Sequence, residues 1–177
     1  MKLAELFGKG RTVFSCEVFP PKRDTPVDSI YTTLDGLKDI QPDFISVTYG
    51  AGGSTSKRTL ELAARLQDVY RVPALAHLTC VSSTREEVTQ QVARLRAAGI
   101  GSILALRGDI PQDTSFPTPE HFRYASELIA HIRGLEGGQE LCIGAACYPE
   151  GHVECPHFST DLDHLKQKVD AGADFLT

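Results

Sequence analysis

The sequence lacks the features that mark several large classes of protein. No apolar run in its 177 residues approaches the ~20 residues that cross a bilayer, so we expect no membrane association. Basic residues are not in excess, because 18 Lys and Arg stand against 23 Asp and Glu, for a formal charge of −5. An acidic balance does not favour binding to a phosphate backbone, so nucleic acid is not an expected partner. Glu5 lies where a secretory signal would need apolar residues.

The cysteines are few and do not follow a pairing pattern. There are five, an odd number, and no Cys-x-x-Cys motif occurs. Disulfide frameworks use an even number of cysteines in secreted chains. We therefore expect reduced thiols and a cytoplasmic protein.

Common nucleotide-binding motifs are also absent. No Gly-x-Gly-x-x-Gly follows the first apolar run, and Thr55 stands where the glycine-rich stretch 50–53 would need its third glycine. A phosphate-binding loop requires Gly directly before Lys, whereas Ser56 precedes Lys57. The stretch is thus interpreted as a loop whose backbone can approach a flat ligand closely.

The sequence does contain a regular alternation of short apolar runs and helical segments. Six runs have the length and β-branched content of strands: Thr12–Phe19, Phe44–Tyr49, Pro73–Leu78, Ser102–Leu106, Leu141–Ala146 and Asp174–Thr177.

Five segments between these runs have helical periodicity and start signals. The first opens at Thr25-Pro26, and the second fills Thr55–Tyr70. The third opens with overlapping capping boxes, Ser83 with Glu86 and Thr84 with Glu87, and ends near Ala98-Gly99. The fourth opens at Thr118-Pro119 and is expected to bury Phe122, and the fifth runs from near Thr160 to Ala171-Gly172.

This alternation predicts an α/β protein with a parallel sheet. The expected fold is a (β/α)8 TIM barrel, represented by roughly its first six strands, because eight units would need ~250 residues. Residues 1–177 then form a single, incomplete catalytic barrel domain, truncated at its C-terminus. A complete doubly wound sheet is the alternative.

Polar residues gather where the predicted strands end, which is where barrels carry their chemistry. Glu17 lies in an otherwise apolar run, so loss of hydration should raise its pKa and suit it to general acid catalysis; a structural strand residue is the alternative. Arg107-Gly108-Asp109 places opposite charges at one strand tip, either as a site or as a structural pair. One further group has the residue types of a zinc site, although its spacing matches no common zinc-binding pattern: Cys147, His152, Cys155 and His157.

Taken together, these strand ends resemble the methylenetetrahydrofolate reductase family. Six motifs occur in family order, each at or near a predicted strand tip or the helix after it: 16–22 (CEVFPPK), 44–51 (FISVTYGA), 77–80 (HLTC), 106–109 (LRGD), 148–152 (YPEGH) and 168–173 (KVDAGA).

The resemblance implies an enzyme with FAD at the carboxyl ends of the barrel strands and NADH or NADPH as electron donor. The reaction would reduce 5,10-methylenetetrahydrofolate to 5-methyltetrahydrofolate, in one-carbon metabolism and methionine synthesis. Glu17 matches the family's general acid, and Asp109 matches an anionic residue near the flavin and the pterin. Both are therefore expected catalytic and substrate-binding residues.

The remaining matches are cofactor contacts. The FAD-binding set implied by the resemblance is Thr48, Tyr49, Ala51, His77, Arg107, Gly108, Asp109, Tyr124, Ala125, Tyr148, His152, Asp161 and Lys168. His152 is thereby assigned to FAD binding and not to a zinc site, and no metal is expected. The family's folate-binding glutamine and a later aromatic folate contact fall after Thr177.

Two alternative functions remain. One is a non-catalytic flavin-binding barrel subunit that works with a partner, and the other is a barrel flavoenzyme of the proline dehydrogenase type. Retention of both Glu17 and Asp109 favours the enzyme, because flavin binding alone needs no proton donor. The full-length protein is expected to act on small molecules and to form a homo-oligomer.

Overall fold

A computed structural model describes residues 2–21, 28–49, 55–81, 83–110 and 120–177. Six strands are present: β1 (Ser15–Val18), β2 (Phe44–Val47), β3 (Ala74–Thr79), β4 (Ser102–Leu106), β5 (Cys142–Ala145) and β6 (Phe175–Leu176). Five α-helices accompany them: α1 (Asp28–Leu37), α2 (Thr55–Asp68), α3 (Arg85–Ala97), α4 (Ala125–Gly134) and α5 (Phe158–Asp170). Three short 3₁₀ helices complete the elements: η1 (Leu3–Leu6), η2 (Lys38–Ile40) and η3 (Gly138–Glu140).

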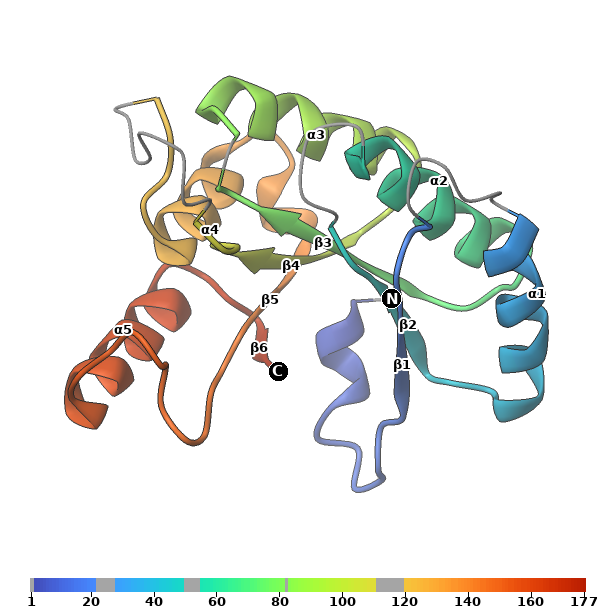
Figure 1. Cartoon of the computed structure of the whole chain (residues 1–177), viewed down its shortest axis with the longest axis horizontal. Helices are drawn as coiled ribbons and strands as arrows, with labels where there is room; N and C mark the ends of the chain where they lie inside the picture. The colour runs from blue at the N-terminus through green and yellow to red at the C-terminus, as the bar shows by residue number, and fades with distance from the viewer. Residues whose placement is uncertain (1, 22–27, 50–54, 82, 111–119) are drawn as a thin grey trace.

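The strands form one parallel sheet in the order β1-β2-β3-β4-β5-β6. Figure 1 shows the sheet curving, with α1 to α4 along its outer side and η1 inside the curve. A doubly wound sheet would reverse its strand order at a switch point, and no reversal occurs here. The (β/α) barrel arrangement is therefore confirmed over the six strands, and the doubly wound alternative is wrong.

Residues alternate between the two faces of the sheet, as strand geometry requires. On the convex face, Ile45, Ala76 and Ile103 belong to a core cluster shared with the helices. On the concave face, their neighbours form a second, smaller cluster, in which Leu3 and Leu6 of η1 pack on these strand residues: Phe44, Leu75, Leu104 and Cys142. The concave face is thus apolar at the strands' amino ends and carries its polar residues further along.

The start of α3 follows one of its two predicted capping boxes. Thr84 Oγ1 accepts a hydrogen bond from the Glu87 N–H at 3.2 Å, and the Glu87 carboxylate accepts one from the Thr84 N–H at 2.7 Å. Gly99 has a φ of 74°, so the predicted left-handed stop is confirmed. The competing Ser83 is buried instead.

The predicted start of the fourth helix is wrong. Thr118-Pro119 lie outside the described residues, but α4 begins only at Ala125. Before it, His121 forms an isolated bridge with Thr84, and the Arg123 N–H donates to the Glu127 carboxylate at 2.7 Å. Phe122 is fully buried as predicted, although it lies in this irregular segment and not in a helix.

The other helix limits differ less from the prediction. The segment Thr25-Pro26 lies outside the described residues, and α1 is described from Asp28. Helix α5 begins at Phe158, two residues before the predicted Thr160, and ends where predicted. Among the described residues, no helix combines the length and the apolar character needed to span a membrane.

Candidate active site

Three neighbouring strands, β1, β2 and β3, bring a carboxylate, a hydroxyl and an imidazole together on the concave face. Glu17 lies opposite Ser46 in the β1–β2 register, and His77 follows on β3. Ser46 Oγ donates to Glu17 Oε2 at 3.2 Å, and His77 Nε2 lies 3.4 Å from the same oxygen. The structure therefore places the predicted acid Glu17 beside the predicted flavin contact His77.

The predicted burial of Glu17 is wrong. Its side chain is 46% exposed, because β1 is an edge strand of the described sheet and has a neighbour on only one side. The carboxylate is consequently open to a ligand that enters the concave face.

His77 is the buried member of this group. Burial lowers the pKa of His77, and the charge of Glu17 acts in the opposite direction without cancelling that effect. The imidazole is therefore neutral at pH 7. In the described part of the chain, its Nε2 has no hydrogen-bond partner, since the 3.4 Å approach to Glu17 lacks hydrogen-bond geometry. An orphaned buried nitrogen is a position for a polar ligand atom.

A second group of predicted residues lies between β4, β5 and α5. Both guanidinium NH groups of Arg107 bind Glu154, at 2.7 and 2.9 Å. The Glu154 N–H donates to His152 Nδ1 at 3.2 Å, and the His152 N–H donates to Asp161 at 2.9 Å. One chain of polar contacts thus joins Arg107, His152 and Asp161, all of which were predicted from the sequence.

Charge and burial shift the pKa values of two basic side chains in this area. The pKa of Arg107 is raised, chiefly by its hydrogen bond with Glu154, whereas burial lowers the pKa of Lys168. Lys168 Nζ donates to the Ala146 carbonyl at 2.9 Å, just past the end of β5. Both cations are therefore anchored near the carboxyl edge of the sheet.

Gly108 follows Arg107 in a conformation that suits glycine. Its φ is +84°, and a Cβ there would lie 2.6 Å from Val81 Cγ1. The neighbouring Asp109 is exposed and contributes to the raised pKa of Arg107. The predicted strand tip thus places opposite charges next to each other, on either side of a glycine that no other residue could replace without strain.

The aromatic residues of the predicted set differ in their exposure. Tyr148 is 52% exposed and meets the ring of His152 edge-on at 5.2 Å between centroids. Tyr124 is 44% exposed, stacks on His164 at 6.3 Å and precedes the buried Ala125 at the start of α4. These rings leave apolar surface accessible to a flat ligand.

Tyr49, unlike Tyr124 and Tyr148, points to the core on the convex face of the sheet. Its ring packs against the convex core, and its hydroxyl donates to Gln91 of α3 at 2.7 Å. The adjacent Thr48 is held by its backbone, since its N–H donates to Val18 and its carbonyl accepts from Thr59. The Tyr49 hydroxyl is therefore already bound to α3, and Ala51 lies outside the described residues.

The zinc set considered from the sequence is not assembled. Cys155 Sγ donates to the His157 carbonyl at 3.4 Å, and His152 Nδ1 accepts from the Glu154 N–H. In the described ranges, the residues whose ligand atoms lie within 4.8 Å of one another are Cys155, Asp161 and His164, a different set.

Two polar residues of the site were missed from the sequence. Ser46 had a detectable signal, because it interrupts the apolar run 44–47 and shares the concave face with Phe44. Glu154 had none, since it sits in a loop whose approach to Arg107 depends on the whole β5–α5 connection.

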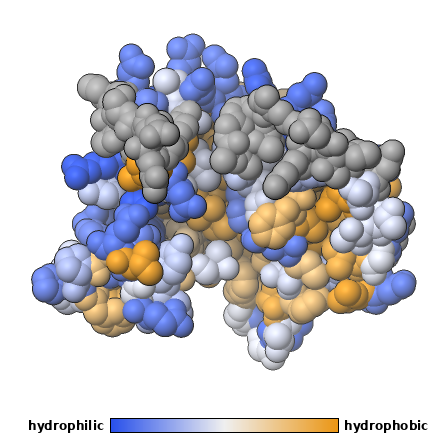
Figure 2. Space-filling model, viewed as in Figure 1, coloured by the Kyte–Doolittle hydropathy of each residue, from blue (hydrophilic) through white to orange (hydrophobic). Residues whose placement is uncertain are grey.

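One further hollow lies away from these groups. A pocket of about 200 Å³ on the convex side is lined by Leu34, Ile45 and Tyr70, among others, and includes no predicted site residue. In Figure 2, by contrast, the molecule is notched between the α5 side and the N-terminal side, with apolar residues on part of the notch wall.

Solved structures support the fold. The chain aligns with phosphoenolpyruvate phosphomutase from Streptomyces platensis subsp. rosaceus at a TM-score of 0.66 and 16% identity, over 98% of this chain and 61% of that one. A phosphonopyruvate hydrolase aligns at a TM-score of 0.65 and 17% identity, over 98% and 60%. At such identities the likeness shows a barrel-type fold and nothing about activity.

Sequence relatives are much closer. The chain is 39% identical over 186 residues to methylenetetrahydrofolate reductase (NADH) 1 of Zea mays, covering 99% of this chain and 31% of the relative. It is 36% identical over 171 residues to 5,10-methylenetetrahydrofolate reductase of Pectobacterium carotovorum subsp. carotovorum, covering 97% and 54%. The chain thus spans about a third to a half of these relatives.

The family profile described as methylenetetrahydrofolate reductase matches residues 2–177. This match covers every strand and helix described above, including Glu17, His77, Arg107 and Asp161. The chain therefore belongs to the methylenetetrahydrofolate reductase family.

Proposed function

We propose that the protein containing this chain reduces 5,10-methylenetetrahydrofolate to 5-methyltetrahydrofolate, with FAD as cofactor and NADH or NADPH as electron donor. The observation that carries the proposal is the accessible Glu17 carboxyl group on the concave face, beside the orphaned Nε2 of His77. A structural carboxylate on a strand would be expected to pair with a cation, whereas Glu17 is placed against a hydroxyl and a neutral imidazole.

The residues present fit a flavin dinucleotide. Arg107 and Lys168 supply positive charge near the carboxyl edge of the sheet, where a diphosphate needs it. The exposed rings of Tyr124 and Tyr148 offer flat apolar surface, and His77 Nε2 can donate to or accept from a polar atom of the ligand, according to its tautomer. Bound FAD would take a hydride from the nicotinamide and supply one to the folate.

Glu17 has a defined task in this reaction. The methylene bridge of the folate accepts hydride poorly until its five-membered ring opens. A proton from Glu17 to the leaving nitrogen allows that C–N bond to break, with the electron pair remaining on nitrogen and an iminium carbon left to receive hydride. Asp109 provides an anion near the pterin and lies beside Arg107.

The compartment and assembly follow as further parts of the proposal. All five cysteines are free, and burial raises the pKa of Cys80 to about 11, so that this thiol stays protonated. Free thiols are the rule in a reducing cytoplasm, where we place the protein. We also propose that the full-length protein is a homo-oligomer, to be tested by sedimentation analysis.

The decisive experiment separates the two half-reactions in the full-length protein by stopped-flow absorbance of the flavin. Glu17→Gln keeps the size of the side chain and removes the acid. It should spare flavin reduction by the nicotinamide and slow reoxidation by methylenetetrahydrofolate by about 10²–10⁴-fold. Asp109→Asn should disturb both steps, since its charge acts on both ligands.

Two results would contradict this assignment. Equal slowing of both half-reactions by Glu17→Gln would make Glu17 structural. Release of FMN alone from the purified protein would exclude FAD as the bound flavin.

A further inference from the structure

The two groups that contact Glu17 share one of its oxygens. Ser46 Oγ donates to Oε2 at 3.2 Å, and His77 Nε2 approaches Oε2 at 3.4 Å. Neither contact uses Oε1. The carboxyl group is thus held by one oxygen, and the other is left for a different partner.

The sheet register makes the Ser46 contact a fixed one. Glu17 and Ser46 are paired across adjacent parallel strands, whose backbones lie about 4.8 Å apart, and Cys16 pairs in the same way with Ile45. Ser46 is only 8% exposed and has apolar neighbours on both sides in β2. An unpaired hydroxyl there would cost about 1–3 kcal/mol, so its bond to Glu17 is strongly favoured.

His77 cannot replace this contact. Its approach lacks hydrogen-bond geometry, and burial lowers its pKa, so that at neutral pH it brings no positive charge to the carboxylate. Of the two neighbours of Oε2, only Ser46 therefore makes a hydrogen bond that fixes the direction of the carboxyl group.

We propose that Ser46 is the positioning residue of Glu17: its hydroxyl anchors Oε2, so that Oε1 is the oxygen that delivers the proton to the folate nitrogen. This inference rests on the proposed function. A free carboxyl group on an edge strand rotates about its side-chain bonds, and a displacement of about 1 Å can cost about 10²-fold in rate. Ser46 thus acts through Glu17 and on the folate half-reaction alone.

The test uses Ser46→Ala in the full-length flavoprotein. We expect reoxidation of the reduced flavin by methylenetetrahydrofolate to slow by about tenfold or more, with flavin content, folate affinity and flavin reduction by the nicotinamide unchanged. Ser46→Thr keeps the hydroxyl and should restore most of the rate. Ser102→Ala is the matched control, because Ser102 is another buried hydroxyl residue at the sheet, paired with Cys142 and remote from Glu17 in the register.

Each outcome decides a separate point. If Ser46→Ala reoxidises at the wild-type rate while Glu17→Gln is slow, the positioning role is overturned. If Ser46→Ala slows both half-reactions or loses its flavin, and Ser46→Thr does the same, the hydroxyl is structural and the proposal also fails. If the wild-type flavin is not reoxidised by methylenetetrahydrofolate at all, the proposed function fails, and the inference that rests on it is withdrawn with it.

Discussion

Arg107 and Glu154 form a bidentate ion pair, in which Arg107 Nη1 donates to Glu154 Oε2 at 2.7 Å and Nη2 donates to Oε1 at 2.9 Å. Arg107 is a residue that the family resemblance assigns to FAD, whereas Glu154 was not predicted for the site. The guanidinium side chain is only 20% exposed, but Glu154 is 58% exposed and can move away. A flavin that binds Arg107 must therefore compete with this carboxylate.

Glu154→Gln should accordingly bind FAD more tightly. The pair is partly exposed and screened by solvent, so we expect only a modest gain of about two- to fivefold in affinity. Titration of FAD into apoprotein, followed by flavin fluorescence, measures it. Glu140→Gln is the matched control, since it removes another Arg–Glu contact, with Arg96, outside the site. Weaker FAD binding by Glu154→Gln would show that Glu154 orients Arg107 instead of competing for it.

Gly108→Ala should destabilise the protein and deplete its flavin. The residue has a φ of +84°, and the new Cβ would lie 2.6 Å from Val81 Cγ1, so we expect a loss of about 1–3 kcal/mol and a shift of Arg107. Urea denaturation and the flavin-to-protein ratio report the two effects. Gly36→Ala provides the contrast: it lies in α1 with open space around it and should stabilise by about 0.4–1 kcal/mol. A wild-type midpoint for Gly108→Ala would refute the strain argument.

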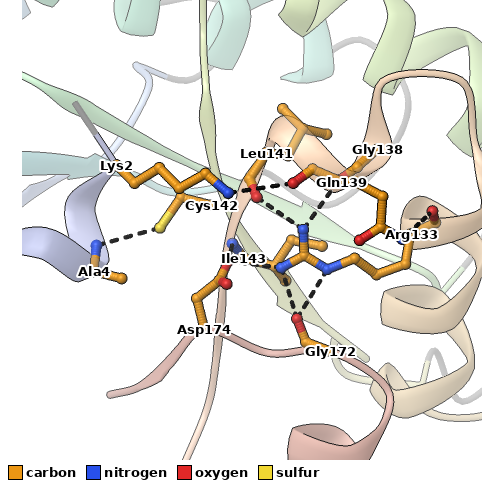
Figure 3. A network of polar contacts seen from close by, with 10 residues as sticks. All are labelled: Lys2, Ala4, Arg133, Gly138, Gln139, Leu141, Cys142, Ile143, Gly172 and Asp174. Atoms are coloured by element: carbon orange, nitrogen blue, oxygen red, sulfur yellow. Dashed lines mark hydrogen bonds and ion pairs between the residues drawn. The ribbon is translucent and has the colours of Figure 1, made fainter.

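Arg133 is the centre of a part-buried polar network at the start of β5 and β6 (Figure 3). Its guanidinium donates to the carbonyls of Gly172, Gly138 and Leu141 and to the Asp174 carboxylate at 2.6 Å. The side chain is 12% exposed, so Arg133→Met would remove a donor from each of these acceptors, although Asp174 would keep its bond from the Ile143 N–H.

We expect this substitution to cost about 1–3 kcal/mol, the usual effect of removing the donor from part-buried hydrogen-bond acceptors. Chemical denaturation of the intact protein measures the loss. Lys166→Met is the control, because its pair with Asp170 is exposed and should contribute less than about 0.5 kcal/mol. Similar small effects from both substitutions would show that the network relaxes around the lost guanidinium.

Asp43 should make stability depend on acidic pH. The hydrogen bond from Arg11, with a second from the Phe14 N–H, lowers the pKa of Asp43 from 3.8 to about 2. Because the folded-state pKa lies below the unfolded one, the stabilising contribution is present above pH 3.8 and is lost as the pH falls through about 2. Asp43→Asn should therefore be less stable than wild type at neutral pH, and the difference should shrink between these two pH values. A difference that stays constant from pH 5 to about 2 would rule out this linkage.

The strands could be predicted from the sequence because alternation and spacing are local properties. Ile45 and Phe44 face opposite sides of β2, as strand geometry requires of consecutive residues once the apolar run is recognised as a strand. The start of α4 could not be predicted in the same way. The signal at Thr118-Pro119 is a good local one, but His121 is paired with Thr84 and the residues that follow it are not helical, and that pairing depends on α3 being in place.

In the candidate site too, some residues could be predicted from local sequence and others depend on the whole fold. Barrel geometry places chemistry at strand ends, so Arg107 and His77 could be singled out from their positions in the sequence, whereas Lys168 lies in α5 and was assigned only by the family resemblance. The exposure of Glu17 could not, because it depends on which strand lies at the edge of the sheet. Glu154 contacts Arg107 across 47 residues, a distance that no periodicity encodes.

Helix η1 has a consequence for synthesis on the ribosome. The Ala4 N–H donates to Cys142 Sγ at 3.3 Å, across 138 residues of sequence, and Lys2 reaches the Gln139 carbonyl at 3.2 Å (Figure 3). The apolar side chains of Leu3 and Leu6 are therefore made long before the β5 part of their docking surface exists. At ordinary translation rates the interval is about 7–30 s, during which Leu3 and Leu6 lack the Cys142 part of the apolar cluster that covers them and have only its earlier members to pack on.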